Sequence, residues 1–114
     1  MSFLKIFFGS GGQVASKSGN TTFFGDLQGK NDIMSDVGGT TYGTGGDCMN
    51  SIGDASYFSG GQVIQKVGNS YYVNGKAYNK IGDTLYGPNG SVWSGNGMTD
   101  SDARNLIWHD QQNG

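Results

Sequence analysis

Large apolar residues recur along the chain at a nearly constant interval, and glycine-rich turns separate them. Four segments align from an aliphatic residue to a tyrosine, in steps of 15, 15 and 14 residues: 37–42, 52–57, 67–72 and 81–86. After each tyrosine comes a glycine turn and then another large side chain, which is Met49, Ile64, Tyr78 or Trp93. A fixed period of this kind indicates that one supersecondary unit is used repeatedly.

The same period reaches back toward the N-terminus. Segment 8–14 resembles segment 57–63, and Phe23 follows Phe8 by fifteen residues. The next step, from Phe23 to Tyr42, is nineteen residues. We therefore expect a longer loop or bulge within 26–32.

Two kinds of tight turn punctuate the repeat. Asn74-Gly75 favours a type I′ hairpin turn, which needs positive φ at both central residues. The pairs at 53–54, 68–69 and 82–83 place glycine first, as a type II′ turn requires. Between the turns lie segments of about four to six residues rich in Tyr, Val, Ile and Thr, which are typical of strands. The pattern predicts roughly ten short strands in antiparallel meander order.

The turns also predict the register. If both are two-residue turns, Val73 lies opposite Lys76 and Ile81 opposite Thr84. One face of this local sheet then carries Tyr72, Ala77, Ile81 and Tyr86, and the other carries Tyr71, Val73, Tyr78 and Leu85 with Lys76 and Lys80. Because neither face is cleanly polar, the sheet must fold over on itself, be covered, or pack against another molecule. A sandwich, a solenoid and an open sheet all remain possible at this point.

The end of the chain follows a helical pattern instead. Thr99 with Asp102 three residues later makes an approximate capping box, and Ala103, Leu106 and Ile107 form one apolar stripe. We expect this helix to cover one patch of the sheet. The predicted fold is thus mainly β, an antiparallel meander of hairpin repeats with one C-terminal helix. We expect a single domain over 1–114, with the repeats in 1–97 and the helix in 98–112.

Composition narrows the range of partners. Charged residues make up 14% of the chain and the formal net charge is −2, so no basic footprint for nucleic acid exists. Cys48 is the single cysteine and excludes an intramolecular disulfide. The apolar cluster at the start is interpreted as a strand, because it is too short for a membrane span and Lys5 lies inside it rather than ahead of it, unlike a signal peptide. The compartment stays open, with the cytoplasm as the default.

No catalytic constellation emerges, and we expect a protein that is not an enzyme and uses no cofactor. His109 is the only histidine, and we expect it to be partly exposed at the helix end; Cys48 is typical of a small turn or strand residue. No metal site is expected, since the aspartates beside glycines (Asp26, Asp47, Asp54 and Asp83) match no calcium-loop spacing. The glycines of 9–12 repeat between strands and do not open a helix, so a phosphate loop is not indicated.

The repeated aromatic residues are the candidate binding residues. Tyr42, Tyr57, Tyr72 and Tyr86 occupy equivalent positions, and Trp93 joins them as a candidate. One interpretation is a core or aromatic ladder that holds the strands in register. The other is an exposed platform that stacks on sugar rings or on the apolar groups of a protein partner.

The segment from Lys80 to Gly90 resembles the tandem isoleucine-glycine-x-threonine-x-tyrosine-glycine hairpin units of small bacterial proteins. The likeness covers about half of the chain. It implies a bacterial or phage origin, and no activity comes with it.

The sequence favours a structural or self-assembling interaction protein. Hairpin repeats leave strand edges exposed, and the low charge does little to block edge pairing. The apolar strand of Phe3, Leu4, Ile6, Phe7 and Phe8 is the candidate assembly strand, expected to add to a neighbour's sheet and give a homo-oligomer or fibre. The alternative is a binding module that recognises a glycan or another protein through its aromatic surface.

Overall fold

The computed structural model describes residues 4–25, 31–43 and 47–113. Within these residues the chain forms twelve strands, two one-turn 3₁₀ helices at Ser10–Gly12 and Pro88–Gly90, and one α-helix. The strands are β1 (Leu4–Gly9), β2 (Val14–Ser18), β3 (Thr21–Gly25), β4 (Asn31–Val37), β5 (Thr40–Tyr42), β6 (Cys48–Ile52), β7 (Ala55–Phe58), β8 (Val63–Val67), β9 (Ser70–Val73), β10 (Lys76–Ile81), β11 (Thr84–Tyr86) and β12 (Val92–Gly95), and the helix α1 is Asp100–Asn113.

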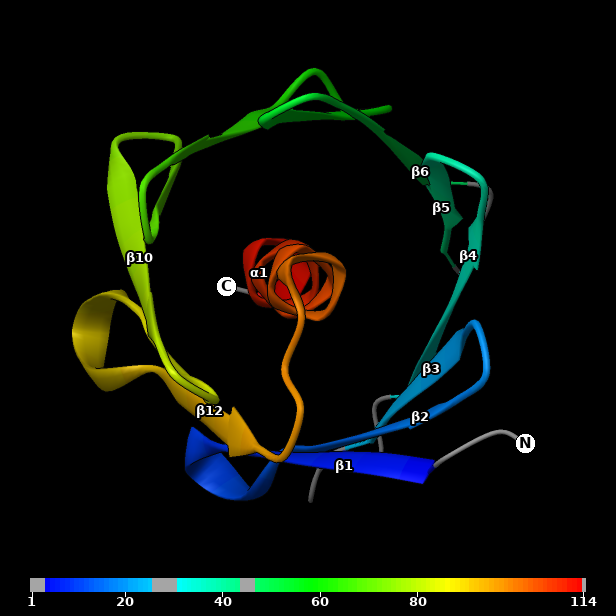
Figure 1. Ribbon diagram of the computed structural model, residues 1–114, viewed down its shortest axis with the longest axis vertical. Coiled ribbons are helices and arrows are strands. Elements are labelled where there is room, and N and C mark those ends of the chain that lie inside the picture. Colours follow the sequence, from blue (N-terminus) through cyan, green and yellow to red (C-terminus); the bar gives the residue numbers. More distant parts are fainter. Residues whose placement is uncertain (1–3, 26–30, 44–46, 114) are drawn as a thin grey trace.

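Each strand pairs with the next in antiparallel order, and β1 pairs with β12 to close a barrel (Figure 1). The prediction of a mainly β meander with one C-terminal helix is confirmed, while the expected number of strands was two too few. Closure also excludes the three arrangements that the sequence left open, a sandwich, a solenoid and an open sheet. The expectation of exposed strand edges is wrong, because Phe7, Phe8 and Gly9 of β1 pair with Gly95, Ser94 and Trp93 of β12.

The turns adopt the predicted geometry. Asn74 and Gly75 both have positive φ, of 52° and 73°, as a type I′ turn requires. At the two-residue turns that begin with glycine, only that glycine is in the left-handed region, for example Gly53 at 61° and Gly82 at 60°. The predicted pairs Val73–Lys76 and Ile81–Thr84 are both present in the register. The expected longer loop of 26–32 falls mostly on residues outside the described ones.

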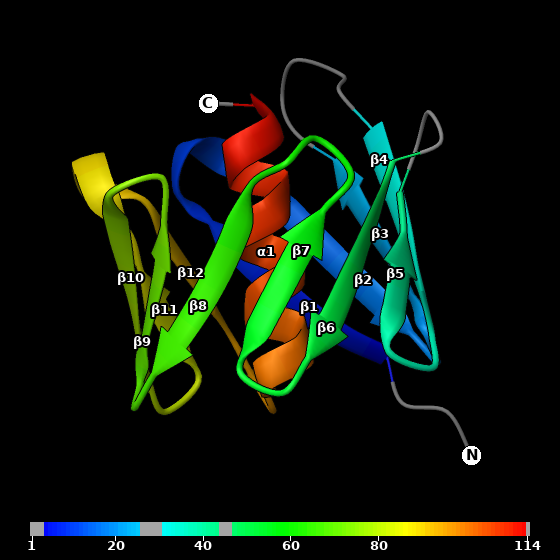
Figure 2. The same ribbon diagram turned by 90° about the horizontal axis from the view of Figure 1, so that it is seen from above.

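The helix runs through the middle of the barrel rather than over one patch of it, so that part of the prediction is wrong (Figures 1 and 2). Its residues 102–109 are buried on every side. A barrel of about eight strands is filled by its own side chains, whereas a wider one leaves a lumen. Here α1 occupies the lumen, since an α-helix with side chains is about 10–12 Å across.

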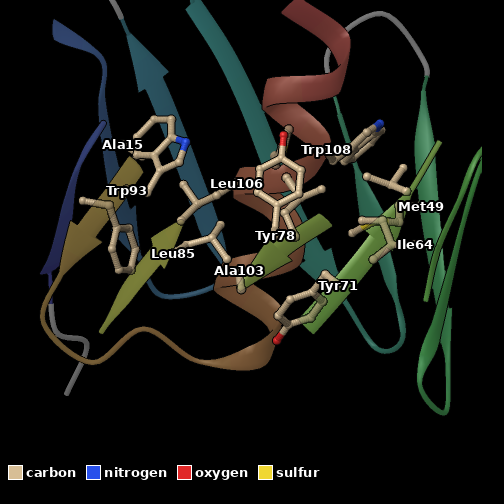
Figure 3. Close-up of a cluster of buried hydrophobic side chains, with 14 of the residues drawn as sticks. Ala15, Met49, Ile64, Tyr71, Tyr78, Leu85, Trp93, Ala103, Leu106 and Trp108 are labelled. Carbon is tan, nitrogen blue, oxygen red and sulfur yellow. The ribbon is translucent and has the colours of Figure 1, made fainter. Parts of the chain in front are cut away.

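The core is the layer between the helix and the inward row of the strands. Met49, Ile64, Tyr78 and Trp93, the large residues that follow each turn in the repeat, are all at most 2% exposed. They form one buried hydrophobic cluster with Ala103, Leu106 and Trp108 of the helix (Figure 3). The face predicted to carry Tyr71, Val73, Tyr78 and Leu85 is this inner one, and the face of Tyr72, Ala77, Ile81 and Tyr86 is the outer one.

Candidate binding surface on the outer barrel wall

Six aromatic side chains point outward at equivalent places around the barrel. They lie on alternate strands and are 46–60% exposed: Phe8 on β1, Phe23 on β3, Tyr42 on β5, Tyr57 on β7, Tyr72 on β9 and Tyr86 on β11. The fifteen-residue repeat produces this arrangement, because one hairpin unit contributes one pair of strands. Exposure of the four tyrosines excludes the core interpretation for them.

The neighbours of each aromatic residue repeat as well. On one adjacent strand the residue directly opposite is an uncharged polar one: Ser94, Ser16, Ser35, Asn50, Gln65 and Asn79, for the six in chain order. On the other adjacent strand it is Val14, Ile33, Cys48, Val63, Ala77 and Val92. Each exposed ring therefore lies between a hydroxyl or amide and a small or aliphatic side chain.

The outward positions of the described strands carry no charged residue. The strand lysines belong to the inward row, and three of them reach the helix. Lys5 and Lys17 bind Asp102 at Nζ–O distances of 3.2 and 2.7 Å, and Lys66 binds Asp100 at 3.3 Å. These three lysines, which would normally help to hydrate a protein surface, instead pair with carboxylates of the helix. The outward positions of the wall are therefore neutral.

Helix α1 is anchored by polar groups around its whole circumference. Thr99 and Asp102 form the predicted capping box, with the Asp102 amide donating to Thr99 Oγ1 at 3.2 Å and the Thr99 amide to Asp102 Oδ2 at 3.1 Å. Arg104 donates to Ser56 Oγ and to Asp100, and Asn105 donates to Asp36. These partners explain how so polar a helix lies buried, since a buried polar group is costly unless it is hydrogen-bonded.

The pKa values of the two aspartates in the first turn of the helix are lowered, which stabilises the folded state at neutral pH. Burial alone would raise the pKa of the Asp102 carboxyl, but hydrogen bonds from Lys17 and the Thr99 amide, with the charges of Lys17 and Lys5, hold that pKa below its usual range. The pKa of Asp100 is likewise lowered, because Tyr71, Arg104 and Lys66 outweigh the effect of burial.

Near the C-terminal end of the helix, Asp110 accepts hydrogen bonds from Ser91 Oγ, from Tyr78 OH and from Trp93 Nε1. Burial and the nearby Asp110 carboxylate raise the pKa of Tyr78 to about 12. The carboxylates and Arg104 therefore hold the helix in place, and sequence reasoning missed this network. The sequence feature that could have revealed this network is the presence of acidic residues on the helix together with lysines on the inward row of the strands.

Trp93 does not belong to the exposed surface, so its inclusion among the candidate binding residues was wrong. It is 1% exposed and its Nε1 donates to Asp110 Oδ1 at 3.2 Å. The reason is strand alternation, because its neighbour Val92 takes the outward position opposite Tyr86. The tryptophan side chain is consequently part of the core.

The candidate assembly strand is divided between the two faces of the wall. Leu4, Ile6 and Phe8 point outward and are 65%, 40% and 60% exposed, whereas Phe7 is buried at 1%. Phe3 lies outside the described residues. A solvent-open groove of about 810 Å³ runs along the seam between β1 and β12, lined by these three outward residues with Lys5, Asp83, Ser94 and others.

The remaining candidates of the sequence lie apart from this surface or show no site. His109 is 5% exposed and stacks on Phe24 with a centroid distance of 4.2 Å, so the expected partial exposure is wrong. Cys48 is half-buried on the outer face opposite Tyr42. Within the described ranges no three His, Cys, Asp or Glu side chains gather as a metal site would need, and Asp26 is not among the described residues.

The chain matches no protein-family model, and neither a curated protein nor a solved structure is detectably similar to it. The resemblance to the bacterial hairpin-repeat proteins therefore stays a prediction. In the described part of the chain, no helix is long and apolar enough to cross a membrane.

Proposed function

We propose that this is a non-enzymatic interaction protein that associates with itself through the outer face of β1–β4. The observation that carries the proposal is a group of seven outward, large apolar side chains on these four adjacent strands. They are Leu4, Ile6, Phe8, Val14, Phe23, Ile33 and Val37, each 37–65% exposed. We call this group the β1–β4 face.

The register supports a continuous patch rather than scattered residues. Phe8 lies directly opposite Val14, and Phe23 lies directly opposite Ile33. Val14 and Phe23 are diagonal neighbours across β2 and β3, within reach of an aromatic side chain. Contiguous apolar surface of this kind on a folded domain marks an interaction site more often than isolated exposed residues do.

A second copy of the chain is the partner that best suits this face. An isologous contact sets the same surface against itself, so any charge on it would meet a like charge near the axis. The β1–β4 face carries no outward charge. It also has both a projecting ring, Phe23 of β3, and a groove at its β1 edge, so one copy can offer the ring where the other offers the hollow.

The route differs from the edge addition expected from the sequence. Since β1 already pairs with β2 over Leu4–Phe8 and with β12 over Phe7–Gly9, most of its backbone is taken up within the barrel, and its outward side chains are what it mainly offers a partner. Pairing through one self-complementary face gives a closed dimer rather than an open fibre.

Sedimentation velocity over a hundredfold range of concentration tests the proposal. We expect a dimer in the wild-type protein and a monomer in Phe23→Lys, because a charge at the centre of the face must be desolvated on association. Tyr72→Lys is the matched control, since Tyr72 and Phe23 are both 47% exposed and occupy equivalent positions on opposite sides of the barrel. A wild-type protein that stays monomeric, or loss of the dimer in Tyr72→Lys alone, would overturn the proposal.

A further inference from the structure

The other side of the barrel carries a different surface, and we propose that it binds an uncharged, soluble polysaccharide that can curve around the wall. Three successive tyrosines lie there directly opposite three side-chain amides: Tyr57 with Asn50, Tyr72 with Gln65, and Tyr86 with Asn79. We call these six residues the tyrosine–amide arc; it spans β6 to β11. This inference is independent of self-association, which uses β1–β4.

Each tyrosine–amide pair combines the two groups that a neutral sugar requires. The exposed ring offers an apolar surface for the C–H face of a sugar, and the amide offers hydrogen bonds to its hydroxyls. Opposite side chains of an antiparallel pair have Cβ atoms about 4.5–5.5 Å apart, so one sugar residue can contact both. The tyrosines are 46–47% exposed, so about half of each side chain is covered by its neighbours and the rest is accessible to a ligand.

Two of the three amides are oriented in advance. Thr40 Oγ1 donates to Asn50 Oδ1 at 2.6 Å, and Ser70 Oγ donates to Asn79 Oδ1 at 2.6 Å. In both cases a hydroxyl on the preceding strand fixes the carbonyl end of the amide. The NH₂ group is thereby left to donate to a ligand, since it has no acceptor among the described residues. Fixing a polar group before binding lowers the entropic cost of using it.

The chemistry of the arc selects an uncharged polymer. Its outward positions include no lysine or arginine, so an anionic chain such as a nucleic acid or an acidic glycan gains no counter-charge. A purely apolar partner would have to desolvate three amides without replacing their hydrogen bonds, at a cost of about 1–3 kcal/mol for each unsatisfied group. Sugar hydroxyls satisfy those amides, and the C–H faces of the sugar cover the rings.

The spacing of the tyrosines favours a chain over a single sugar. Successive tyrosines are two strands apart and two residues further along, since Tyr57 lies opposite Val63 and Tyr72 opposite Gln65 on β8, so their Cα atoms are about 12 Å apart at the usual strand dimensions. The outward rings lie further apart still because the wall is convex, so neighbouring sites are separated by more than one sugar residue and a polymer is needed to reach both. Once one site is occupied, a continuous chain reaches the next at high effective concentration, so weak single contacts add to useful avidity.

The curvature of the barrel restricts the shape of that chain. Twelve strands close the ring, so successive tyrosines are turned by about a sixth of a revolution, and three of them cannot touch one flat surface. The ligand must bend around the wall. Flexible or helical soluble polysaccharides meet this requirement, and flat crystalline ones do not.

Affinity electrophoresis through gels with dissolved polysaccharide tests the inference directly. The probes are soluble β-1,3-glucan, soluble α-1,4-glucan and soluble β-mannan, with polygalacturonate as the anionic comparison. We expect at least one neutral polymer to retard the wild-type protein and polygalacturonate not to. Tyr72→Ala, at the centre of the arc, should weaken retardation about tenfold, and Tyr57→Ala or Tyr86→Ala should weaken it less because two adjacent sites survive.

Tyr42→Ala is the matched control, since Tyr42 is 53% exposed at an equivalent position but lies opposite Ser35 rather than an amide, outside both the arc and the β1–β4 face. Circular dichroism spectra and thermal melts of every variant identify any loss of folding. The inference is overturned if no neutral polymer retards the protein, if polygalacturonate binds as well, or if Tyr42→Ala has the larger effect. It is also overturned if only a protein partner is found to bind at Tyr72. None of these results depends on whether a dimer forms.

Discussion

Asp102 is the residue on which the position of the helix depends most. Its side chain is 1% exposed and its two oxygens contact Lys5 Nζ at 3.2 Å and Lys17 Nζ at 2.7 Å. Asp102→Asn removes the negative charge with almost no change of shape. The two lysines then face the lumen of the barrel without the carboxylate that pairs with both of them.

The expected cost follows from this geometry. Removing one partner of a buried ion pair destabilises a protein by about 3–5 kcal/mol. The lower end applies here, because asparagine still accepts the hydrogen bond from the Thr99 amide and Lys17 also has Asp36 at 3.8 Å. We therefore expect a loss of about 3 kcal/mol, which is a large share of the roughly 5–15 kcal/mol available to a small domain. The midpoint of thermal unfolding should fall by about 12 °C.

Urea unfolding followed by circular dichroism measures this loss. With a slope of about 2 kcal/mol/M, the midpoint should move down by about 1.5 M. Asp54→Asn is the control: Asp54 is exposed in a turn and only its backbone carbonyl binds Arg104, so its change should stay within about 0.5 kcal/mol. If Asp102→Asn and Asp54→Asn unfold at the same urea concentration, the ion pairs of Asp102 with Lys5 and Lys17 do not hold the helix and the reasoning fails.

Two further predictions concern pH and close packing. Because the pKa values of Asp100 and Asp102 lie below their unfolded-state values, their contribution to stability is present above about pH 4 and is lost as the pH falls through the lowered folded-state values. Thermal melts from pH 6 to pH 2 should show this fall, and a fall of equal size in Asp102→Asn would contradict the assignment. Gly95→Ala should destabilise the protein by about 1–3 kcal/mol, since the added methyl would meet the Ile6 carbonyl and the Phe7 ring. Gly60→Ala, with nothing within 4 Å of the added methyl, should be neutral or slightly stabilising, and equal urea midpoints for the two variants would refute the seam geometry.

Local features of the fold were within reach of the sequence because short-range chemistry determines them. The Asn74-Gly75 turn fixes the register from Val73–Lys76 onward, and alternation then assigns every residue of β9–β11 to a face. The capping box at Thr99 depends on four consecutive residues. The repeat also contained the answer for Trp93, since it aligned Trp93 with Met49, Ile64 and Tyr78, and all four are in the core.

Closure of the barrel and the place of the helix lay beyond the sequence, because both depend on contacts between distant residues. The seam joins Phe7 to Gly95, and no local pattern relates them. The helix looked like a surface helix with one apolar stripe, because Asp102, Arg104 and Asn105 have the polarity of a solvent-facing side. They are buried since the wall supplies a partner to each.

The same contacts explain the candidate surface. Three strand lysines point inward and pair with the helix. The outward positions carry aromatic, aliphatic, hydroxyl and amide side chains, so the neutrality of the outer wall follows from the packing of the lumen. From the sequence alone the tyrosines had two interpretations. Only their register on odd-numbered strands, between an uncharged polar residue and a small or aliphatic one, distinguished a repeated outer surface from a core ladder.

Amine labelling of the native protein, read by peptide mass spectrometry, tests most directly whether the lysines paired with the helix carboxylates, such as Lys17, are enclosed in a filled lumen. Lys17 has a side chain that is 13% exposed and bonded to Asp102, while Lys76 is exposed beside the Asn74-Gly75 turn. We predict that Lys76 is labelled many times faster than Lys17, and that Asp102→Asn narrows the difference. Equal labelling rates for Lys17 and Lys76 in the wild-type protein would contradict the account.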